Sequence, residues 1–272
     1  ANRLSLLRDW VLDGGALECY EDCHPNVTNC IFAGNKAEWQ QGGGMCCLGS
    51  SPVVTNCTFT GNCANTRGGA IFCYRESNPQ IANCILWDNT SDHGGQIGLV
   101  YYDSPGYVEA GTEITVSYCD VEGGPDDVYL EDANCLLHWN HGNMDADPCF
   151  AGAGYWDDMD TPEDADDDVW IDGDYHLKSQ AGRWAPLGGS WIKDDVTSPC
   201  IDAGDQRAAV GREQFPNGGI INMGAYGGTL EASKSYFDSP VCETIMAGDV
   251  NGDCRVDFAD FQLMAFHWLW QQ

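Results

Sequence analysis

PNVTNCIFAGN (25–35), PVVTNCTFTGN (52–62) and PQIANCILWDN (79–89) are three copies of one segment, set 27 residues apart. A Gly-Gly pair and an apolar stretch follow each copy, and GGALECY (14–20) belongs to an earlier copy. A fixed period of about 20–50 residues is typical of stacked units that cannot bury their apolar faces alone. The repeat therefore indicates the architecture strongly and the chemistry only weakly.

Apolar residues within each copy follow a period of two. Val27, Cys30 and Phe32 mark the apolar positions of the first copy, and the later copies have apolar residues at the same places. Short β-rich runs between Gly-rich and Asn-rich corners, without a helical stripe, predict parallel strands stacked rung on rung, about 4.8 Å apart. The predicted fold class is all-β, a parallel β-helix with rungs of about 27 residues.

The chain divides into three predicted parts. Regular rungs occupy 1–124, including a fourth copy, TEITVSYCDVEGG (112–124), that follows a longer insertion. The pattern loosens over 125–240, which we expect to form elaborated final rungs and a cap with an acidic loop. A small separate unit with a calcium loop and a helix is predicted for 241–272.

Composition limits the partners and the compartment. The net charge is −30 with 12 basic residues, so nucleic acid and anionic membrane surfaces are poor partners and divalent cations are natural counterions. No run of about 18 apolar residues is present, so no membrane span is predicted. Fifteen cysteines indicate an oxidising, extracellular setting, and the odd number leaves at least one thiol free or paired between chains.

Two columns of identical side chains recur with the repeat: Asn29, Asn56, Asn83 and Cys30, Cys57, Cys84. The asparagines are predicted at a corner, with each amide bonding to the next rung, and an Asn-lined ligand groove is the alternative. The cysteines are predicted to be small, inward-facing apolar residues. Disulfides between rungs and metal ligation stay open as alternatives for this cysteine column.

The sharpest chemical motif is GDVNGDCRVDFADF (248–261). Oxygen-bearing side chains fall at loop positions 1, 3, 5, 9 and 12, counted from the first aspartate, and position 7 supplies a backbone carbonyl: Asp249, Asn251, Asp253, Asp257, Asp260 and, at position 7, Arg255. This spacing predicts one calcium ion in a helix-flanked loop. A helix is expected from Phe261 to Trp270, with Phe261, Met264, Ala265 and Trp268 on one face.

A second calcium site is predicted in the acidic loop 155–176, around Asp164, Asp166 and Asp168. Carboxylate oxygens are suitable ligands for a hard cation such as calcium. A solvated acidic edge without a bound ion is the alternative for this loop.

The C-terminal unit resembles one calcium-binding half of a dockerin. Dockerins carry two such segments, and only one is visible here. Position 6, usually glycine, is Cys254, which makes a disulfide to Cys242 a candidate link between the loop and its own linker. The resemblance implies a calcium cofactor, and it leaves open whether a cohesin-like protein binds a single half.

The rest of the chain resembles a family of secreted bacterial right-handed parallel β-helix proteins, the pectate-lyase-like solenoids. The likeness is carried by the repeats and by NMDADPCF (143–150), GDYHLKSQAGRW (173–184), SPCIDAGD (198–205) and NMGAYGG (222–228). It implies a right-handed coil and an extracellular, secreted or cell-surface location. It implies little about activity, because such proteins are mostly uncharacterised.

Enzyme motifs are weak in this sequence. A lyase needs a basic residue near a calcium-bound uronate, and the repeats hold only Lys36, Arg67 and Arg75. A hydrolase needs paired carboxylates, and no such pair is recognisable. The sequence favours a non-catalytic, calcium-binding structural or adhesive element, with a polysaccharide or cell-surface ligand. A carbohydrate-active enzyme or carbohydrate-binding module attached by a dockerin-like tail is the rival interpretation.

The first residues are expected to lie inside a rung. Counting back 28 residues from Ile31 and Phe32 reaches Arg3 and Leu4. An end rung exposes backbone groups and core side chains unless it is capped. A fragment boundary at residue 1 is one explanation. The other is self-association, in which another copy covers the open N-terminal rung and head-to-tail contacts form filaments.

Overall fold

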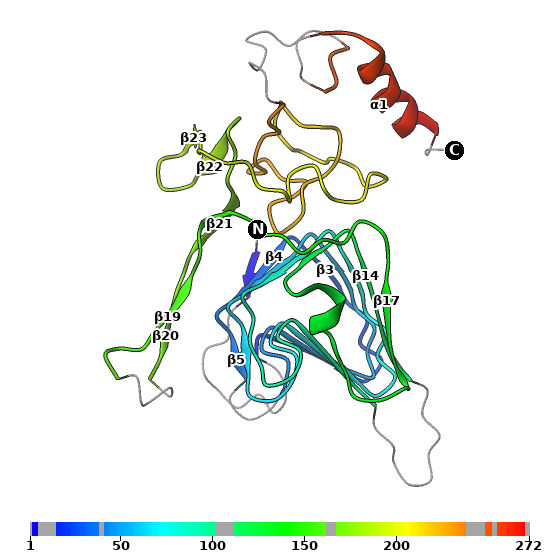
Figure 1. Ribbon diagram of the computed structural model, residues 1–272, viewed down its shortest axis with the longest axis vertical. Coiled ribbons are helices and arrows are strands. Elements are labelled where there is room, and N and C mark those ends of the chain that lie inside the picture. The colour runs from blue at the N-terminus through cyan, green and yellow to red at the C-terminus, as the bar shows by residue number, and fades with distance from the viewer. Residues whose placement is uncertain are drawn as a thin grey trace.

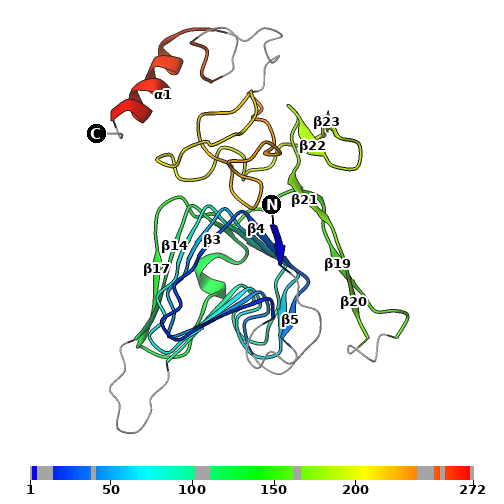
Figure 2. The same ribbon diagram turned by 180° about the vertical axis from the view of Figure 1, so that it is seen from behind.

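A computed structural model describes residues 2–4, 15–37, 41–101, 111–161, 167–237, 248–251 and 255–269. Within them the chain winds into a right-handed parallel β-helix with three sides, seen close to end-on in Figures 1 and 2. A tail of hairpins and loops lies against the coil. Beyond this tail the described chain ends in a short helix (Figure 1). The all-β fold class predicted from the repeat is confirmed.

Three parallel sheets form the sides of the coil. The first contains β1 (Asn2–Leu4), β4 (Cys30–Ala33), β8 (Thr58–Thr60), β12 (Ile85–Trp87) and β15 (Asp120–Val121). The second contains β2 (Leu17–Tyr20), β6 (Met45–Leu48), β10 (Ile71–Tyr74), β13 (Ile97–Val100) and β16 (Tyr129–Leu130). The third contains β3 (Asn26–Thr28), β7 (Val53–Thr55), β11 (Gln80–Ala82), β14 (Thr112–Ser117) and β17 (Cys135–Trp139).

Shorter elements complete the described chain. The parallel pair β5 (Lys36–Ala37) and β9 (Cys63–Ala64) lies at a corner, and the 3-10 helix η1 (Gly124–Asp127) lies within the outline of the coil in both views (Figures 1 and 2). The antiparallel tail pairs are β18 (Phe150–Gly152) with β21 (Asp174–Leu177), β19 (Tyr155–Asp157) with β20 (Val169–Ile171), and β22 (Arg183–Ala185) with β23 (Ser190–Ile192). The C-terminal helix is α1 (Phe258–Leu269).

The repeat fixes the register of the sheets. Val27, Val54 and Ile81 are paired neighbours in the third sheet. Alternate residues of a strand point to opposite faces, so one residue in two enters the core. The predicted inward set is buried in one cluster, and it includes Phe32 and Phe59, whose rings stack with centroids 4.4 Å apart. The predicted alternation is confirmed.

The register also holds at both irregular ends of the repeat. Arg3 and Leu4 pair with Ile31 and Phe32, as the 28-residue shift predicts. The fourth copy stays in phase despite the insertion before it, since β11 pairs with β14 and β12 with β15 in the register of the repeat. The amide of Cys84 also donates to Cys119 Sγ at 3.4 Å. The insertion therefore lengthens a corner and leaves the stacking unchanged.

A ladder of asparagine amides runs along the inside of one corner. Asn35 Nδ2 donates to Asn62 Oδ1 at 2.7 Å, and Asn62 Nδ2 donates to Asn89 Oδ1 at 2.7 Å. Asn89 Nδ2 then donates to Gln96 Oε1, and Gln96 Nε2 donates to the carboxylate oxygen Oε2 of Glu122 at 3.0 Å. All the donors point the same way and end on a charge, so the bonds polarise one another in a low-dielectric interior.

The column of Asn29, Asn56 and Asn83, which was predicted to bond from amide to amide, bonds to the tail instead. Asn29, Asn56 and Asn83 have φ of 53°, 51° and 54°, a left-handed conformation that asparagine adopts more easily than most residues. In this conformation their side chains turn toward the tail. Asn29 Nδ2 donates to the carbonyls of Ala225 and Gly227 at 3.0 and 2.8 Å. The predicted amide-to-amide bonding of this column is therefore wrong.

The other two asparagines of the column also hold the tail. Asn56 Nδ2 donates to the carbonyl of Asn222 at 3.2 Å, and Asn83 Oδ1 accepts from the amide of Asp205 at 2.7 Å. Three successive rungs thus dock one segment of the tail, 205–227. An apolar interface lies beside these bonds, where Ile31 and Ile85 of the coil pack with Ile201 and Met223 of the tail, among others. We call residues 222–228 the docking loop.

Ten of the thirteen described cysteines are buried. Cys30, Cys57 and Cys84 are buried in the main core cluster, as predicted, and no disulfide joins any two of the thirteen described cysteines. Burial raises the pKa of the Cys84 thiol well above its ordinary value, so this thiol stays protonated and is a poor metal ligand. The proposed Cys242–Cys254 pair lies outside the described residues.

The β19–β20 hairpin packs along the side of the coil (Figure 1). Gly34 and Gly61, equivalent residues of two rungs with φ near 60°, leave room for the ring of Trp170. A Cβ on either glycine would lie 1.9 Å from that ring. Trp156 Nε1 also donates to the carbonyl of Gly61 at 3.0 Å. The two glycines thus leave the space on the side of the coil in which Trp170 of this hairpin packs.

Candidate functional site

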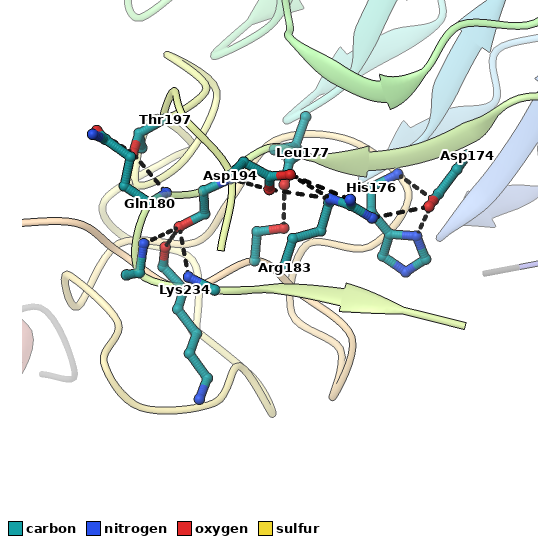
Figure 3. Close-up of polar contacts among 12 residues, drawn as sticks. Asp174, His176, Leu177, Gln180, Arg183, Asp194, Thr197 and Lys234 are labelled. Atoms are coloured by element: carbon teal, nitrogen blue, oxygen red, sulfur yellow. Dashed lines mark hydrogen bonds and ion pairs between the residues drawn. The ribbon is translucent and has the colours of Figure 1, made fainter. Parts of the chain in front are cut away.

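A network of charged side chains crosses the tail (Figure 3). Asp174 begins β21, Arg183 begins β22 and Asp194 follows β23. Figure 3 shows the guanidinium of Arg183 between the two carboxylates, and it donates from Nη1 to Asp174 Oδ2 and from Nε to Asp194 Oδ2, both at 3.1 Å. Charge-assisted bonds of this kind are stronger than neutral ones, and here they join three separate segments.

His176 extends the network from the same strand. It lies two residues after Asp174, so the two side chains share one face of β21. His176 Nδ1 is 2.5 Å from Asp174 Oδ1, and its Nε2 is 3.4 Å from Glu231 Oε2. The imidazole stacks on the ring of Tyr226 with centroids 3.6 Å apart and is 1% exposed. A buried imidazole is therefore clamped between two carboxylates.

The charge state of Asp174 follows from these contacts. Burial by itself would raise the pKa of Asp174. The hydrogen bond and charge of His176, with the charge of Arg183, outweigh this effect and hold the pKa below its ordinary value. Asp174 is thus ionised at neutral pH, and its oxygens accept from both partners.

This arrangement has two chemical capacities. The side chains of Asp174 and Glu231 are 33% and 46% exposed, so solvent reaches both carboxylates although His176 itself is covered. An imidazole between two carboxylates can accept a proton on one nitrogen and release it from the other. The same bonds also stabilise the fold of the tail, since they connect strand β21 to the segment that contains Glu231.

A second buried carboxylate supports the docking loop. Glu213 Oε1 accepts from the amides of Asn222 and Gly228 at 2.9 and 2.8 Å, so both ends of the loop are fixed by one oxygen. Glu213 Oε2 is buried and has no hydrogen-bond partner within the described part of the chain. Burial raises the pKa of Glu213 to about 7, and the nearby charge of Asp202 acts in the same direction.

A third carboxylate lies at the junction of the coil and the tail. Asp120, in the last strand of the first sheet, accepts from Cys200 Sγ at 3.0 Å and from the amide of Ala146 at 3.0 Å. Asp120 is fully buried, and burial raises its pKa to about 6. The contact ties segment 198–205, which the sequence singled out, to the final rung.

The C-terminal loop is closed by the carboxylate of Asp260. Its Oδ1 accepts from the amides of Val250 and Asn251 at 2.7 and 3.2 Å, and its Oδ2 accepts from the amide of Asp257 at 2.8 Å. Asp257 Oδ1 in turn accepts from the amide of Ala259 at 2.8 Å. These reciprocal bonds form a capping box, and they explain why α1 begins at Phe258 rather than at the predicted Phe261.

These contacts bring the first and last positions of the predicted calcium loop together. Asp249 and Asp260 are buried, at 6% and 0% exposure, although α1 is otherwise largely exposed. Asn251 is half-buried and Arg255 is exposed. Asp253 lies outside the described residues. The predicted donors are hard oxygens, the ligand type that calcium takes, and both oxygens of Asp260 here accept backbone amides.

The acidic loop is only partly described. Asp168 lies just before β20 and is half-buried, and neighbouring Asp167 accepts from Thr161 Oγ1 at 2.8 Å. Asp164 and Asp166 lie outside the described residues. Among the side chains that are placed, no three His, Cys, Asp or Glu residues lie together in the manner of metal ligands. The described helices also include none that is long and apolar enough to span a bilayer.

Comparison with protein families agrees with the architecture. Residues 12–149 match a family described as the right handed beta helix region, which is just over half of the chain. The chain belongs to the right-handed β-helix family. Among curated proteins and solved structures, nothing matches this β-helix chain.

The β-helix match ends where the tail begins. Residues 143–204 match a second family, described as disaggregatase related. Asp174, His176, Arg183 and Asp194 all lie inside this match, whereas Glu231 lies after it. The charged network is therefore mostly contained in the second matched segment.

Proposed function

We propose that this β-helix protein is a calcium-binding, non-catalytic structural or adhesive element that works outside the cell. The observation that carries the proposal is the docking of the tail across three rungs by Asn29, Asn56 and Asn83. In this docking, three successive rungs on one side of the coil bind the tail. Together with the internal amide ladder, it makes the coil and tail one stiff body suited to holding other parts at fixed distances.

The calcium part of the proposal rests on the C-terminal loop. Asp249, Asn251, Asp257 and Asp260, with Asp253 and the carbonyl of Arg255, have the spacing of a calcium loop. The contacts of Asp260 hold the loop ends together. A second ion in the acidic loop, bound by Asp164, Asp166 and Asp168, is proposed on the sequence alone.

The extracellular location is supported by charge and by the class of metal site. A net charge of −30 disfavours anionic partners and suits a calcium-rich medium. Calcium loops of extracellular modules work at roughly 0.1–1 mM free calcium, far above cytosolic levels. A polysaccharide or cell-surface ligand and head-to-tail contacts at the N-terminal rung belong to the same proposal.

Calorimetry of the full chain tests calcium binding. We expect a saturable calcium heat that Asp249→Ala reduces by at least about tenfold in affinity, because a ligand charge is lost. Asp195→Ala is the matched control, since it removes an exposed carboxylate from the tail. No calcium heat, or equal heats for the wild type and Asp249→Ala, would rule the C-terminal site out.

One observation favours a second candidate, an enzyme acting on polysaccharides. Asp174 and Glu231 are partly exposed on either side of His176, an arrangement that can move a proton. The non-catalytic proposal predicts no product from pectins, alginates or glucans incubated with the protein. Reproducible product release by the wild type that Asp174→Asn abolishes, while an Asp195→Asn control retains it, would favour the enzyme instead.

A further inference from the structure

Helix α1 carries the most exposed aromatic surface of the described chain. Phe258 and Trp268 are each 74% exposed and Phe261 is 59% exposed. The ring centroids of Phe258 and Phe261 are 6.0 Å apart, so the two side chains form one patch. Isolated exposed apolar residues are ordinary on protein surfaces, but a contiguous aromatic patch marks an interaction site.

The patch is a stripe along one face. At about 100° of rotation per residue, positions 258, 261, 264 and 268 fall within roughly a third of the helix circumference. Met264, 44% exposed, fills the interval between the aromatic residues. The sequence predicted that Phe261, Met264 and Trp268 would share a face, and the structure leaves this face open to solvent.

The stripe carries no charge, although the chain carries −30. The only acidic residue within α1 is Asp260, and its carboxylate is buried in the loop, where it accepts three amides. No lysine or arginine is present between Phe258 and Leu269. Such a face offers nothing for a charged partner to recognise, and it is complementary to another uncharged apolar stripe.

The area of the stripe is adequate for a helix pair. An aromatic side chain buries about 150–250 Å², so the three exposed fractions amount to roughly 300–500 Å² of aromatic surface on one helix. Two copies supply about 600–1,000 Å², to which Met264 adds. A specific interface needs about 1,000 Å², so two stripes reach the lower end of that range.

We propose that a second copy of this chain covers the stripe, with the two α1 helices packed face to face about a two-fold axis. Each aromatic residue then contacts the same surface of its partner, and the contact closes at a dimer. This differs from contacts at the N-terminal rung, which would be heterologous and open-ended. The stripe contains none of the predicted calcium ligands, so the interface itself does not use them.

Sedimentation equilibrium of the full chain tests the proposal, in about 0.15 M salt so that the negative charges are screened beyond roughly 8 Å. We expect a monomer–dimer equilibrium with a dissociation constant in the range of about 1–100 μM, as befits a small interface. Phe261→Glu and Trp268→Glu, tested separately, should each weaken the dimer at least about tenfold. Ala259→Glu adds the same charge on the opposite, exposed face of the helix and should leave the equilibrium unchanged.

Amide exchange of the helix in the variants, compared with wild type diluted to monomer, verifies that each variant still forms α1. A wild type that stays monomeric throughout this range overturns the proposal. So does a dimer, or any larger species, that both stripe substitutions leave unchanged. The proposal is also overturned if Ala259→Glu weakens the dimer as much as Trp268→Glu does. The added charge, rather than the loss of the stripe, would then explain both effects.

Discussion

Replacing Asn62 by leucine is expected to lower the free energy of unfolding by about 3–5 kcal/mol, although the side chains are similar in size. The Asn62 amide oxygen accepts both the backbone amide and Nδ2 of Asn35, and its own Nδ2 donates to the carbonyl of Phe32. Leucine would leave two buried donors without an acceptor, and each such loss costs about 1–3 kcal/mol. Urea unfolding followed by circular dichroism measures the change.

Asn78→Leu is the matched control for this substitution. Asn78 is exposed in the following rung, so the same chemical change there should cost less than about 0.5 kcal/mol. If the two variants lose similar stability, the internal amide ladder does not contribute as described, and general effects of removing asparagine would explain both.

Stability of the tail is expected to fall as the pH rises through about 7. Burial raises the pKa of Glu213 from an ordinary 4.5 to about 7, so the folded state binds more protons than the unfolded state between these values. The contribution of this group is fully present below about pH 4.5 and is lost above pH 7. The shift corresponds to about 3 kcal/mol between about pH 4.5 and pH 8.

Glu213→Gln is expected to remove most of that dependence. The amide keeps an oxygen for the two loop amides and titrates no proton. Half-buried Asp202 and buried Asp120, whose pKa values are also raised, remain in the variant, so the difference between wild type and variant isolates Glu213. Thermal unfolding between about pH 5 and pH 8 makes the comparison, with Asp195→Asn as an exposed control. Parallel pH profiles for wild type and Glu213→Gln would contradict the prediction.

The fold of the coil was predictable because every rung buries the same pattern of apolar residues against its neighbours. A period of 27 residues with alternating apolar positions determines which residues stack, which face is buried and where the register lies. Even the pairing of Arg3 with Ile31 followed from counting. The sequence is informative here because the partners of each strand are copies of itself.

The direction of the asparagine columns was not predictable from periodicity alone. Asn29 and Asn35 recur with the same spacing, so the repeat does not say which column faces inward. The choice depends on backbone conformation. Asn29 has φ of 53° and faces the tail, whereas Asn35 is directed along the interior. The partners of Asn29 lie 196 and 198 residues away, beyond any local pattern.

The charged network of the tail lacked even a periodic signal. Asp174, His176 and Arg183 lie within GDYHLKSQAGRW (173–184), which carries the family resemblance, and His176 is not part of a spacing typical of a metal or catalytic site. Glu213 gave no clue, since a buried carboxylate is recognisable only from the fold around it.

Hydrogen exchange of the full chain, with calcium and with a chelator, tests calcium binding by the C-terminal loop most directly. We predict that calcium slows exchange in peptides covering 248–269, where Asp260 accepts from the amides of Val250 and Asn251, and leaves the strands of the coil unchanged. Identical exchange of these peptides in both conditions, or a change spread evenly over the coil, would contradict a calcium site in this loop.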